Sequence, residues 1–244
     1  MCATFCVMPV EKKYFLEWAK TEEFRQKVQN ALGVIRKAIL IARKPYVAVS
    51  GGKDSLTVLH LVLKVKPDVD VWHWDHGSYL MPREIEKEIV KTIFSMCNPK
   101  QVVLESSSRL GGEAARWDYK RWYRAFYGTL YRVAKERGWD LCFLGIRAEE
   151  SHRRKVKYDF FVAGEMTICC PIFDWNWRDV WAYIISNKIR YPKIYDKLIK
   201  LVGWKNARLT TFFDYEFAWK IDLDKYVLWR NYNIENRERK REIK

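Results

Sequence analysis

The chain has 244 residues, of which 49% are apolar and 16% are aromatic, and this composition excludes an intrinsically disordered protein. No apolar run approaches the roughly 20 residues that a membrane-spanning helix needs, so no membrane partner is expected. The formal net charge of +15 at pH 7 favours a polyanionic partner, although a lysine-rich surface that only aids solubility would give the same total.

At the N-terminus, the segment MCATFCVMPVEKK places its charges after a short apolar patch rather than before it, unlike a secretory signal peptide. We therefore expect a soluble, cytoplasmic protein whose six cysteines are reduced. Cys97 and Cys142 lie in apolar patterns and are expected in the core, while the adjacent Cys169 and Cys170 would point to opposite faces of a strand. No iron–sulfur cluster is expected, because no cysteine follows this pair, and Cys2 and Cys6 could join as ligands only if the N-terminus folds back.

Helices and strands are predicted to alternate along the chain. Apolar residues recur at helical spacing over 11–43, which predicts one or two helices there. Short apolar runs predict strands at 46–50, 69–74, 101–105, 141–145 and 167–172. Helical patterns follow at 53–65, from Pro82 onward, at 117–137 and at 177–186. Gly138 is a favoured stop for the third of these helices, and Asn176 with Asp179 forms a capping-box-like pair before the fourth.

Strands that alternate with helices in this way predict an α/β fold, namely a doubly wound, parallel, five-stranded sheet with helices on both faces. We expect this central domain to span residues 45–200. Helical extensions would flank it, over 1–44 on the N-terminal side and over 201–244 on the C-terminal side. The last residues, NRERKREIK, form a charged tail that is expected to be solvated.

The most informative stretch is YVAVSGGKDSLTVLHLVL, residues 46–63, where an apolar strand meets a glycine-rich loop and then a helix. Such a loop exposes backbone N–H groups, and the helix N-terminus adds the positive end of its dipole, so the junction is suited to hold an anion. Lys53 would supply a mobile cation and Ser55 a hydroxyl. The glycine spacing of the common GxxxxGK[ST] nucleotide loop is absent.

Several motifs resemble those of a known family. The hexapeptide SGGKDS, residues 50–55, resembles the PP-loop of the ATP-pyrophosphatase-like superfamily. The segment LGIRAEESHRRK, residues 144–155, resembles the G-x-R-x-x-E-S-x-x-R segment of the phosphoadenosine phosphosulfate (PAPS) reductase family. The segment CPIFDWNWRDVWAYI, residues 170–184, resembles that family's P-x-x-x-W-x-x-x-D-V-W-x-Y-I helix, and Tyr195 with Asp196 resembles its following tyrosine–aspartate stretch. The resemblance implies an adenine-nucleotide-alpha-hydrolase-like fold.

Carried over position by position, the resemblance implies a PP-loop nucleotide-binding domain for ATP or another adenine nucleotide, with Mg²⁺ at its phosphates. The residues that would bind the nucleotide are Ser50, Gly51, Gly52, Lys53, Asp54, Ser55, Asp75, Gly145 and Arg147. The residues that would act in catalysis are Lys53, Asp54, Arg147 and Arg154. The two arginines would neutralise charge around the α-phosphate. The side chains that would hold the metal are not identified.

Some of the polar residues have a second interpretation. Asp75 matches the family's D-x-G and could contact the nucleotide or a metal, but a turn-forming aspartate at a strand end would look the same. Glu150 is expected to orient an arginine rather than act as a base. His73, His76 and His152 lie near predicted strand ends, but no metal-ligand spacing links them, so no zinc is proposed.

A basic, aromatic segment favours a nucleic-acid substrate. From residue 116 the chain reads RWDYKRWYRAFYGTLYRVAKER, in which arginines are interleaved with aromatic rings that can stack on bases. On a helix, Trp122, Phe126 and Leu130 share one face and are expected in the core, which leaves the arginine face outward. The residues predicted to bind the substrate are Arg121, Arg124, Arg153, Arg154 and Lys155.

PAPS and adenylyl-sulfate reductases resemble one another in a C-terminal nucleophilic cysteine, and this sequence has no cysteine beyond Cys170. We therefore interpret the chain as an enzyme that cleaves ATP at the α-phosphate and releases pyrophosphate. The cleavage would activate a substrate, RNA or DNA, for sulfur transfer or another modification, with sulfur from a separate donor protein. Two alternatives stay open: a divergent reductase of a small sulfonucleotide, with Cys169 or Cys170 as nucleophile, and a non-catalytic nucleotide-binding subunit.

Overall fold

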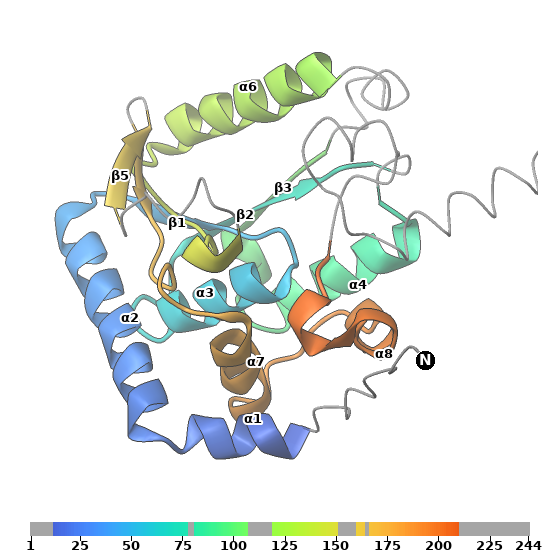
Figure 1. Ribbon diagram of the computed structural model, residues 1–244. Coiled ribbons are helices and arrows are strands. Elements are labelled where there is room, and N and C mark those ends of the chain that lie inside the picture. Colours follow the sequence, from blue (N-terminus) through green and yellow to red (C-terminus); the bar gives the residue numbers. More distant parts are fainter. Residues whose placement is uncertain (1–11, 78–80, 107–118, 151–159, 164–165, 210–244) are drawn as a thin grey trace, which may run out of the picture.

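The computed structural model describes residues 12–77, 81–106, 119–150, 160–163 and 166–209 (Figure 1). The strands are Pro45–Ala48 (β1), Asp70–Asp75 (β2), Val102–Ser106 (β3), Leu141–Phe143 (β4), Phe160–Ala163 (β5) and Met166–Cys169 (β6). The α-helices are Lys12–Ala19 (α1), Glu22–Ile41 (α2), Lys53–Leu63 (α3), Arg83–Phe94 (α4), Tyr119–Arg137 (α6), Trp177–Ser186 (α7) and Ile194–Asn206 (α8).

The strands form one sheet in the order β3-β2-β1-β4-β6-β5. Five of them, β1, β2, β3, β4 and β6, run parallel, which confirms the predicted doubly wound sheet. β5 is a sixth strand that was not predicted, and it pairs antiparallel with β6, with Phe161 opposite Ile168. Two antiparallel neighbours need no helix between them, so the alternation of strands and helices gave no signal for β5.

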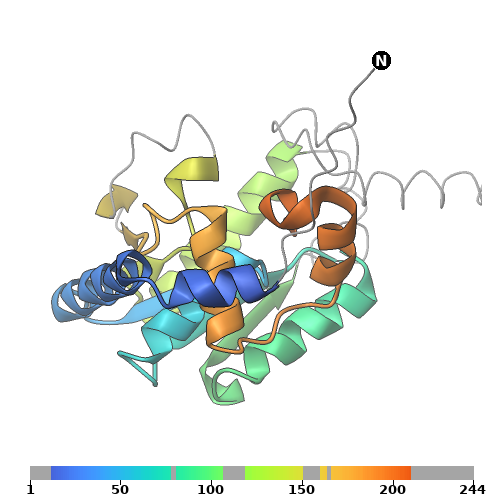
Figure 2. The same ribbon diagram turned by 60° about the horizontal axis from the view of Figure 1, so that its bottom comes forward.

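Helices cover both faces of the sheet (Figures 1 and 2). Among the described helices, α6 covers one face, while α3, α4 and α7 cover the other, with α1 packed on α7 and α2 on α3. The apolar core is divided in the same way. One buried cluster joins α2, α3, α4 and α7 to the sheet. A second cluster joins Trp72 and Trp74 of β2 to Val133 and Ala134 of α6.

A buried carboxylate holds α1 and α2 against α7. Asp179, in the first turn of α7, accepts hydrogen bonds from Trp18 Nε1 at 2.8 Å and from Lys27 Nζ at 2.9 Å. The same side chain accepts from the backbone amide of Asn176, while Asn176 Oδ1 accepts from the amide of Asp179. The predicted capping box is therefore present, and its aspartate also anchors the N-terminal helices.

Other predicted helix boundaries also agree with the structure. Pro82 is the N-cap of α4, and Gly138, with a φ of +71°, follows the end of α6. Phe126 packs edge-on against Trp72, as expected for the apolar face of α6. α8 was not predicted, and Gly203, with a φ of +75°, kinks it near its end. None of the helices in the described part of the chain is long and apolar enough to cross a membrane.

Candidate nucleotide-binding site

The candidate site lies where the order of the strands reverses. From β1 the chain winds outward through β2 to β3 and then returns to β4 on the other side of β1. In open α/β sheets, ligands bind beyond the carboxyl ends of the strands at such a switch point. Residues 50–55 follow β1 there, and residues 144–147 follow β4. The two motifs that the sequence singled out are therefore neighbours in space.

Gly145 shows how closely the two loops approach. A Cβ atom on Gly145 would lie 2.7 Å from the carbonyl carbon of Asp54 and 2.7 Å from the amide nitrogen of Ser55. Both are backbone atoms at the start of α3, so a side chain at this position would push the helix away. Gly145 thus has a packing role, since it sets the distance between the loop after β4 and the loop after β1.

Residues 50–55, called the anion loop below, are tied together by their own side chains. Ser55 Oγ accepts from the amide of Ser50 at 3.2 Å and donates to the carbonyl of Gly52 at 2.9 Å. Gly51 has a φ of +78°, a conformation that favours glycine, and a Cβ there would lie 2.4 Å from Ile89 Cγ2. Gly52 is the N-cap of α3. The first backbone amides of α3 therefore follow directly after the bend of the loop, which is an arrangement suited to binding an anion.

Lys53 is buried, and the expectation of a mobile cation is wrong. Its side chain is 1% exposed, and Nζ donates to the carbonyl of Ala207 at 2.9 Å and lies 3.6 Å from Asp54 Oδ2. Burial lowers the pKa of the ammonium group, and the charge of Asp54 opposes this shift. The sequence pattern showed a loop but could not show that the segment after α8 covers it.

Arg147 is 3% exposed and lies among three acidic side chains. Its Nε donates to Asp54 Oδ1 at 2.6 Å, its Nη1 donates to Glu149 Oε2 at 2.5 Å, and its Nη2 lies 3.9 Å from Glu150 Oε1. Burial alone would lower the pKa of Arg147, but the three carboxylates raise it. Burial alone would likewise raise the pKa of Asp54, but Lys53 and Arg147 hold it below its usual value. The ion pairs therefore favour the charged forms of Asp54 and Arg147.

α8 and the segment after it add contacts that sequence reasoning did not assign to the site. The hydroxyl of Tyr195 accepts from the amide of Lys53 at 2.8 Å and from the amide of Leu209 at 3.3 Å. Arg208 forms an ion pair with Glu150, which agrees with the expectation that Glu150 orients an arginine. The sequence did contain a signal for Tyr195, namely the tyrosine–aspartate stretch. For Arg208 the sequence offered no signal other than its positive charge.

Asp75 lies at the end of β2 in a bidentate ion pair. Its two carboxylate oxygens accept from Arg83 Nη1 and Nη2, each at 2.7 Å, and Oδ1 also accepts from the amide of Gly77 at 2.8 Å. Burial alone would raise the pKa of Asp75, but Arg83 and the Gly77 amide lower it. These contacts match the turn-forming interpretation of Asp75, and a nucleotide or metal would have to compete with Arg83.

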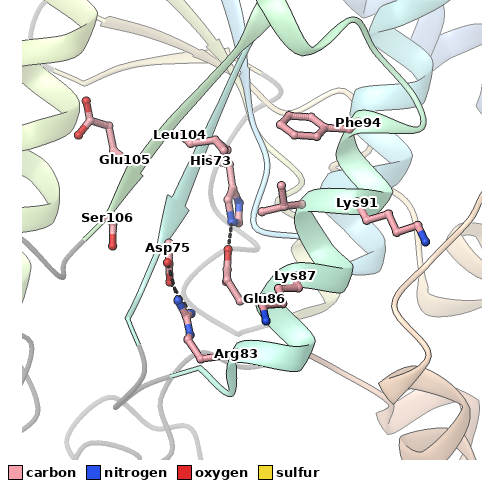
Figure 3. A pocket seen from close by; sticks show the side chains of 11 residues that line it. His73, Asp75, Arg83, Glu86, Lys87, Lys91, Phe94, Leu104, Glu105 and Ser106 are labelled. Carbon is pink, nitrogen blue, oxygen red and sulfur yellow. Dashed lines mark hydrogen bonds and ion pairs between the residues drawn. The ribbon is translucent and has the colours of Figure 1, made fainter.

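A groove of about 510 Å³ lies between α4 and the edge strand β3 (Figure 3). Val90, Phe94 and Leu104 form much of its apolar lining, and the Asp75–Arg83 pair lies toward one end of it. In the described part of the chain, no group of three or more His, Cys, Asp or Glu side chains could hold a metal ion.

Several predicted residues lie outside the described part of the chain. They are His152, Arg153, Arg154 and Lys155, which follow the 3-10 turn Ala148–Glu150. Arg121 belongs to α6, although its side chain is not described, and Arg124 is exposed on the same helix. The structure therefore brings Lys53, Asp54 and Arg147 together, while the proposed substrate-binding residues stay predictions.

The described cysteines are core thiols. Cys169 and Cys170 are 0% and 1% exposed and belong to the clusters on opposite faces of the sheet, as predicted for adjacent residues, although β6 ends at Cys169. Burial raises the pKa of Cys142 to about 12 and that of the half-buried Cys97 to about 11. Thiols held in this way react slowly as nucleophiles.

Comparison with known proteins identifies the family. Residues 44–207 match the phosphoadenosine phosphosulfate reductase domain. An uncharacterized protein of Methanocaldococcus jannaschii is 32% identical over 190 residues, which are 72% of this chain but only 38% of that protein. The adenosine 5′-phosphosulfate reductase 2 of Bacillus subtilis is 23% identical over 170 residues, or 66% of this chain and 71% of that protein. The chain therefore belongs to the PAPS reductase family, whose members are enzymes of the PP-loop superfamily.

Solved structures agree on the fold. The PAPS reductase of Candida auris, crystallised as a phosphate complex, matches with a TM-score of 0.53 and 18% identity over 72% of this chain and 92% of that one. The FMN adenylyltransferase of Candida glabrata in complex with ATP matches with a TM-score of 0.54 and 14% identity over 75% of this chain and 64% of that one. Both likenesses show the adenine-nucleotide-alpha-hydrolase-like fold.

Proposed function

We propose that the chain binds an adenine nucleotide at the anion loop and cleaves ATP at the α-phosphate, releasing pyrophosphate and activating a substrate. The observation that carries this proposal is the contact between the two loops at the switch point, where Asp54 accepts from Arg147 at 2.6 Å. A nucleotide bound at this switch point would meet backbone amides at its terminal phosphates and a guanidinium group near its α-phosphate. Related structures with phosphate and with ATP support this class of ligand.

The buried cations would stabilise the charge of the leaving pyrophosphate. The loop amides and Lys53 would act on the terminal phosphates, and Arg147 with Arg154 on the α-phosphate. Because Lys53 and Arg147 are buried, their interaction with phosphate would be screened far less than at the surface. Lys53 must first release the carbonyl of Ala207, so nucleotide binding would compete with the segment after α8.

Asp54 is suited to the role of an ionised ligand rather than a proton donor. Its pKa is held below the usual value by Lys53 and Arg147, although burial works in the opposite direction. Its Oδ2 atom lies 3.6 Å from Lys53 Nζ, beyond a normal hydrogen bond, and so can turn to a hard cation. Mg²⁺ that enters with the nucleotide would neutralise phosphate charge there.

For the activated substrate we propose RNA or DNA. Arg124 is exposed on α6, and α6 is the helix that follows β3, so its first turns belong to the same edge of the sheet as the anion loop. Arg121, Arg153, Arg154 and Lys155 would extend this basic surface. A sulfur nucleophile delivered by a separate donor protein would then displace AMP from the adenylated position of the nucleic acid, so that the bond to sulfur forms as the bond to AMP breaks.

Reduction of a small sulfonucleotide is the second candidate, and the named Bacillus relative favours it, since that protein is an adenosine 5′-phosphosulfate reductase. The reaction needs a thiolate that can attack the sulfur of the nucleotide. Cys169 and Cys170 are buried among apolar side chains on the two faces of the sheet, so either would have to become exposed first. We therefore rank this reaction below ATP cleavage.

Incubation of the protein with ATP labelled at the α- or γ-phosphate tests the proposal, with and without RNA or DNA. We expect pyrophosphate as the released product and its complete loss in Lys53→Ala. Release of ADP and phosphate would contradict the reaction class, and nucleotide binding without any turnover would favour a non-catalytic subunit. A parallel incubation with PAPS or adenylyl sulfate and thioredoxin should give no sulfite. Sulfite that disappears in Cys169→Ser or Cys170→Ser would favour the reductase.

A further inference from the structure

α4 contacts the anion loop and the strand end that precedes it. Ile89 of α4 packs on Gly51 so closely that a Cβ on Gly51 would lie 2.4 Å from Ile89 Cγ2. One turn earlier on the same helix, Glu86 is 5% exposed and lies against His73 of β2, which is 2% exposed. The helix therefore carries both an apolar and a polar contact toward the same loop.

His73 links Glu86 to the backbone just before the anion loop. Its Nδ1 lies 2.6 Å from the carbonyl oxygen of Val49. Its Nε2 lies 2.7 Å from Glu86 Oε1, and a dashed line in Figure 3 marks this second contact. A carbonyl oxygen only accepts hydrogen bonds, so Nδ1 must donate, and this fixes the orientation of the ring. Val49 directly precedes Ser50, the first residue of the anion loop.

This buried pair is poorly suited to stabilise the core. Forming the pair removes two polar side chains from water, which costs free energy. In addition, Glu86 Oε2 has no hydrogen-bond partner among the described residues. Apolar side chains of similar volume would usually give equal or greater stability. The pair can instead fix the orientation of the Val49 carbonyl group, which lies where β1 ends and the anion loop begins.

We infer that His73 and Glu86 are positioning residues for the anion loop. Glu86 holds the imidazole ring, the ring holds the Val49 carbonyl, and this fixes the direction of the next peptide groups, where the proposed nucleotide binds. The nucleotide part of this inference rests on the proposed function, whereas the effect on the loop does not. Neither side chain touches the substrate, and both act through the backbone of residues 49–51.

Three single variants test the inference. His73→Leu removes both hydrogen bonds. Glu86→Gln keeps them, because the glutamine amide can donate to Nε2 of a neutral imidazole whose Nδ1 still donates to Val49. Glu84→Gln, an equal change at an exposed position of α4, is the control. The readouts are amide hydrogen exchange of residues 49–53 without ligand, the affinities for ATP and for inorganic pyrophosphate, and thermal unfolding.

We expect His73→Leu to speed exchange in the loop and to weaken binding of both probes, each by roughly tenfold, the size of one lost hydrogen bond. Glu86→Gln and Glu84→Gln should stay close to the original protein. Unchanged loop exchange in His73→Leu would overturn the inference. An equal loss in Glu86→Gln would overturn it too, since charge rather than orientation would then be responsible.

A second pair of variants keeps the test decisive if His73→Leu does not fold. The amide nitrogen of asparagine lies near the position of Nδ1, and that of glutamine lies near Nε2. His73→Asn should therefore preserve slow loop exchange through Val49, and His73→Gln should lose it. Equal exchange in the two would contradict the inference. If the original protein binds neither ATP nor pyrophosphate, the proposed function fails, but the exchange measurements still decide the role of His73.

Discussion

The anion loop and helix α6 both carry positively charged side chains, but those at the loop are buried, whereas those described on α6 are exposed or half-exposed. Lys53 and Arg147 are 1% and 3% exposed and lie against carboxylates at fixed distances. On α6, Arg124 is exposed, and the half-exposed Arg132 forms an ion pair with Glu136 one turn away. The first set is shielded from salt and water, and the second is not.

This difference shows what the net charge can and cannot reveal. The cations around the anion loop are balanced by acidic side chains within the same network, so the site adds little to the total of +15. The members of this network are Lys53, Arg147 and Arg208 with Asp54, Glu149 and Glu150. The excess charge must therefore lie largely elsewhere, where it can act on a large polyanion but not on the reacting phosphate.

The largest effect on the binding of ATP is expected from Lys53→Met. This variant removes the buried ammonium group but keeps most of the side-chain volume. Pyrophosphate release should fall below detection, and ATP affinity should fall roughly 10- to 100-fold, the size of a lost charged hydrogen bond. Stability should change by only about 1 kcal/mol, because burial of the ammonium group is itself unfavourable. Isothermal titration and thermal unfolding measure the two quantities.

Lys64→Met is the matched control for Lys53→Met. Lys64 is exposed at the other end of α3 and donates to Asn187 Oδ1 at 3.1 Å. We expect this variant to bind and cleave ATP like the original protein. An equal loss of ATP binding in both variants would mean that the buried and exposed cations do not differ in function.

Arg147→Met should have the largest effect on stability, because it leaves Asp54 without the guanidinium group that lies 2.6 Å from its carboxylate. We expect a loss of about 3–5 kcal/mol in the free energy of unfolding near neutral pH. Pyrophosphate release should stop as well. Glu149 is exposed enough to recover its hydration, so Asp54 should account for most of the cost. Urea unfolding at pH 7 measures the effect.

The same variant should change the response to acid. The pKa of Asp54 lies below its ordinary value of 3.8, so its contribution to stability is fully present above that value and is lost as pH falls through the lowered pKa. Without Arg147 the folded-state pKa of Asp54 moves up towards its unfolded value, so Asp54 contributes less to the loss of stability as the pH falls. Unfolding followed between pH 2 and pH 6, roughly the titration range of carboxyl groups, should show this weaker dependence of stability on pH. An unchanged dependence of stability on pH would contradict the ion pair.

Gly145→Ala should have an intermediate effect, which acts through backbone packing rather than charge. The new Cβ would lie 2.7 Å from backbone atoms of Asp54 and Ser55, so the start of α3 must move. We expect a loss of roughly 1–3 kcal/mol in stability together with weaker ATP binding. Gly128→Ala on α6 is the control, because nothing lies within 4 Å of the added atom. That change should be neutral or slightly stabilising.

The sequence was sufficient for most of the fold because periodic apolar patterns are local. The five parallel strands and the capping box of α7 were predicted, whereas β5 was not, since it forms a hairpin without an intervening helix. The site divides in the same way. The anion loop and Arg147 lie in contiguous motifs, but Tyr195 and Ala207 reach the loop only through the packing of α8. For the same reason, the burial of Lys53 could not be predicted.

The smallest effect on the nucleotide site is expected from a double charge reversal on α6, Arg121→Glu with Arg124→Glu. If this face binds RNA or DNA, nucleic-acid affinity should fall roughly 10- to 100-fold near 0.1 M salt, while ATP affinity stays unchanged. The plot of log K against log salt should also become shallower, by about 0.9 for each phosphate contact that is lost.

The control is Arg36→Glu with Lys37→Glu, exposed on α2, which gives the same change in charge away from the switch point. That control should lose much less affinity, because only the general attraction is reduced. Equal losses in the two double variants would mean that the whole surface attracts nucleic acid without a defined site. A complete lack of RNA or DNA binding by the original protein at low salt would leave the exposed charge of α6 without this role, while the buried charges of the anion loop would keep theirs.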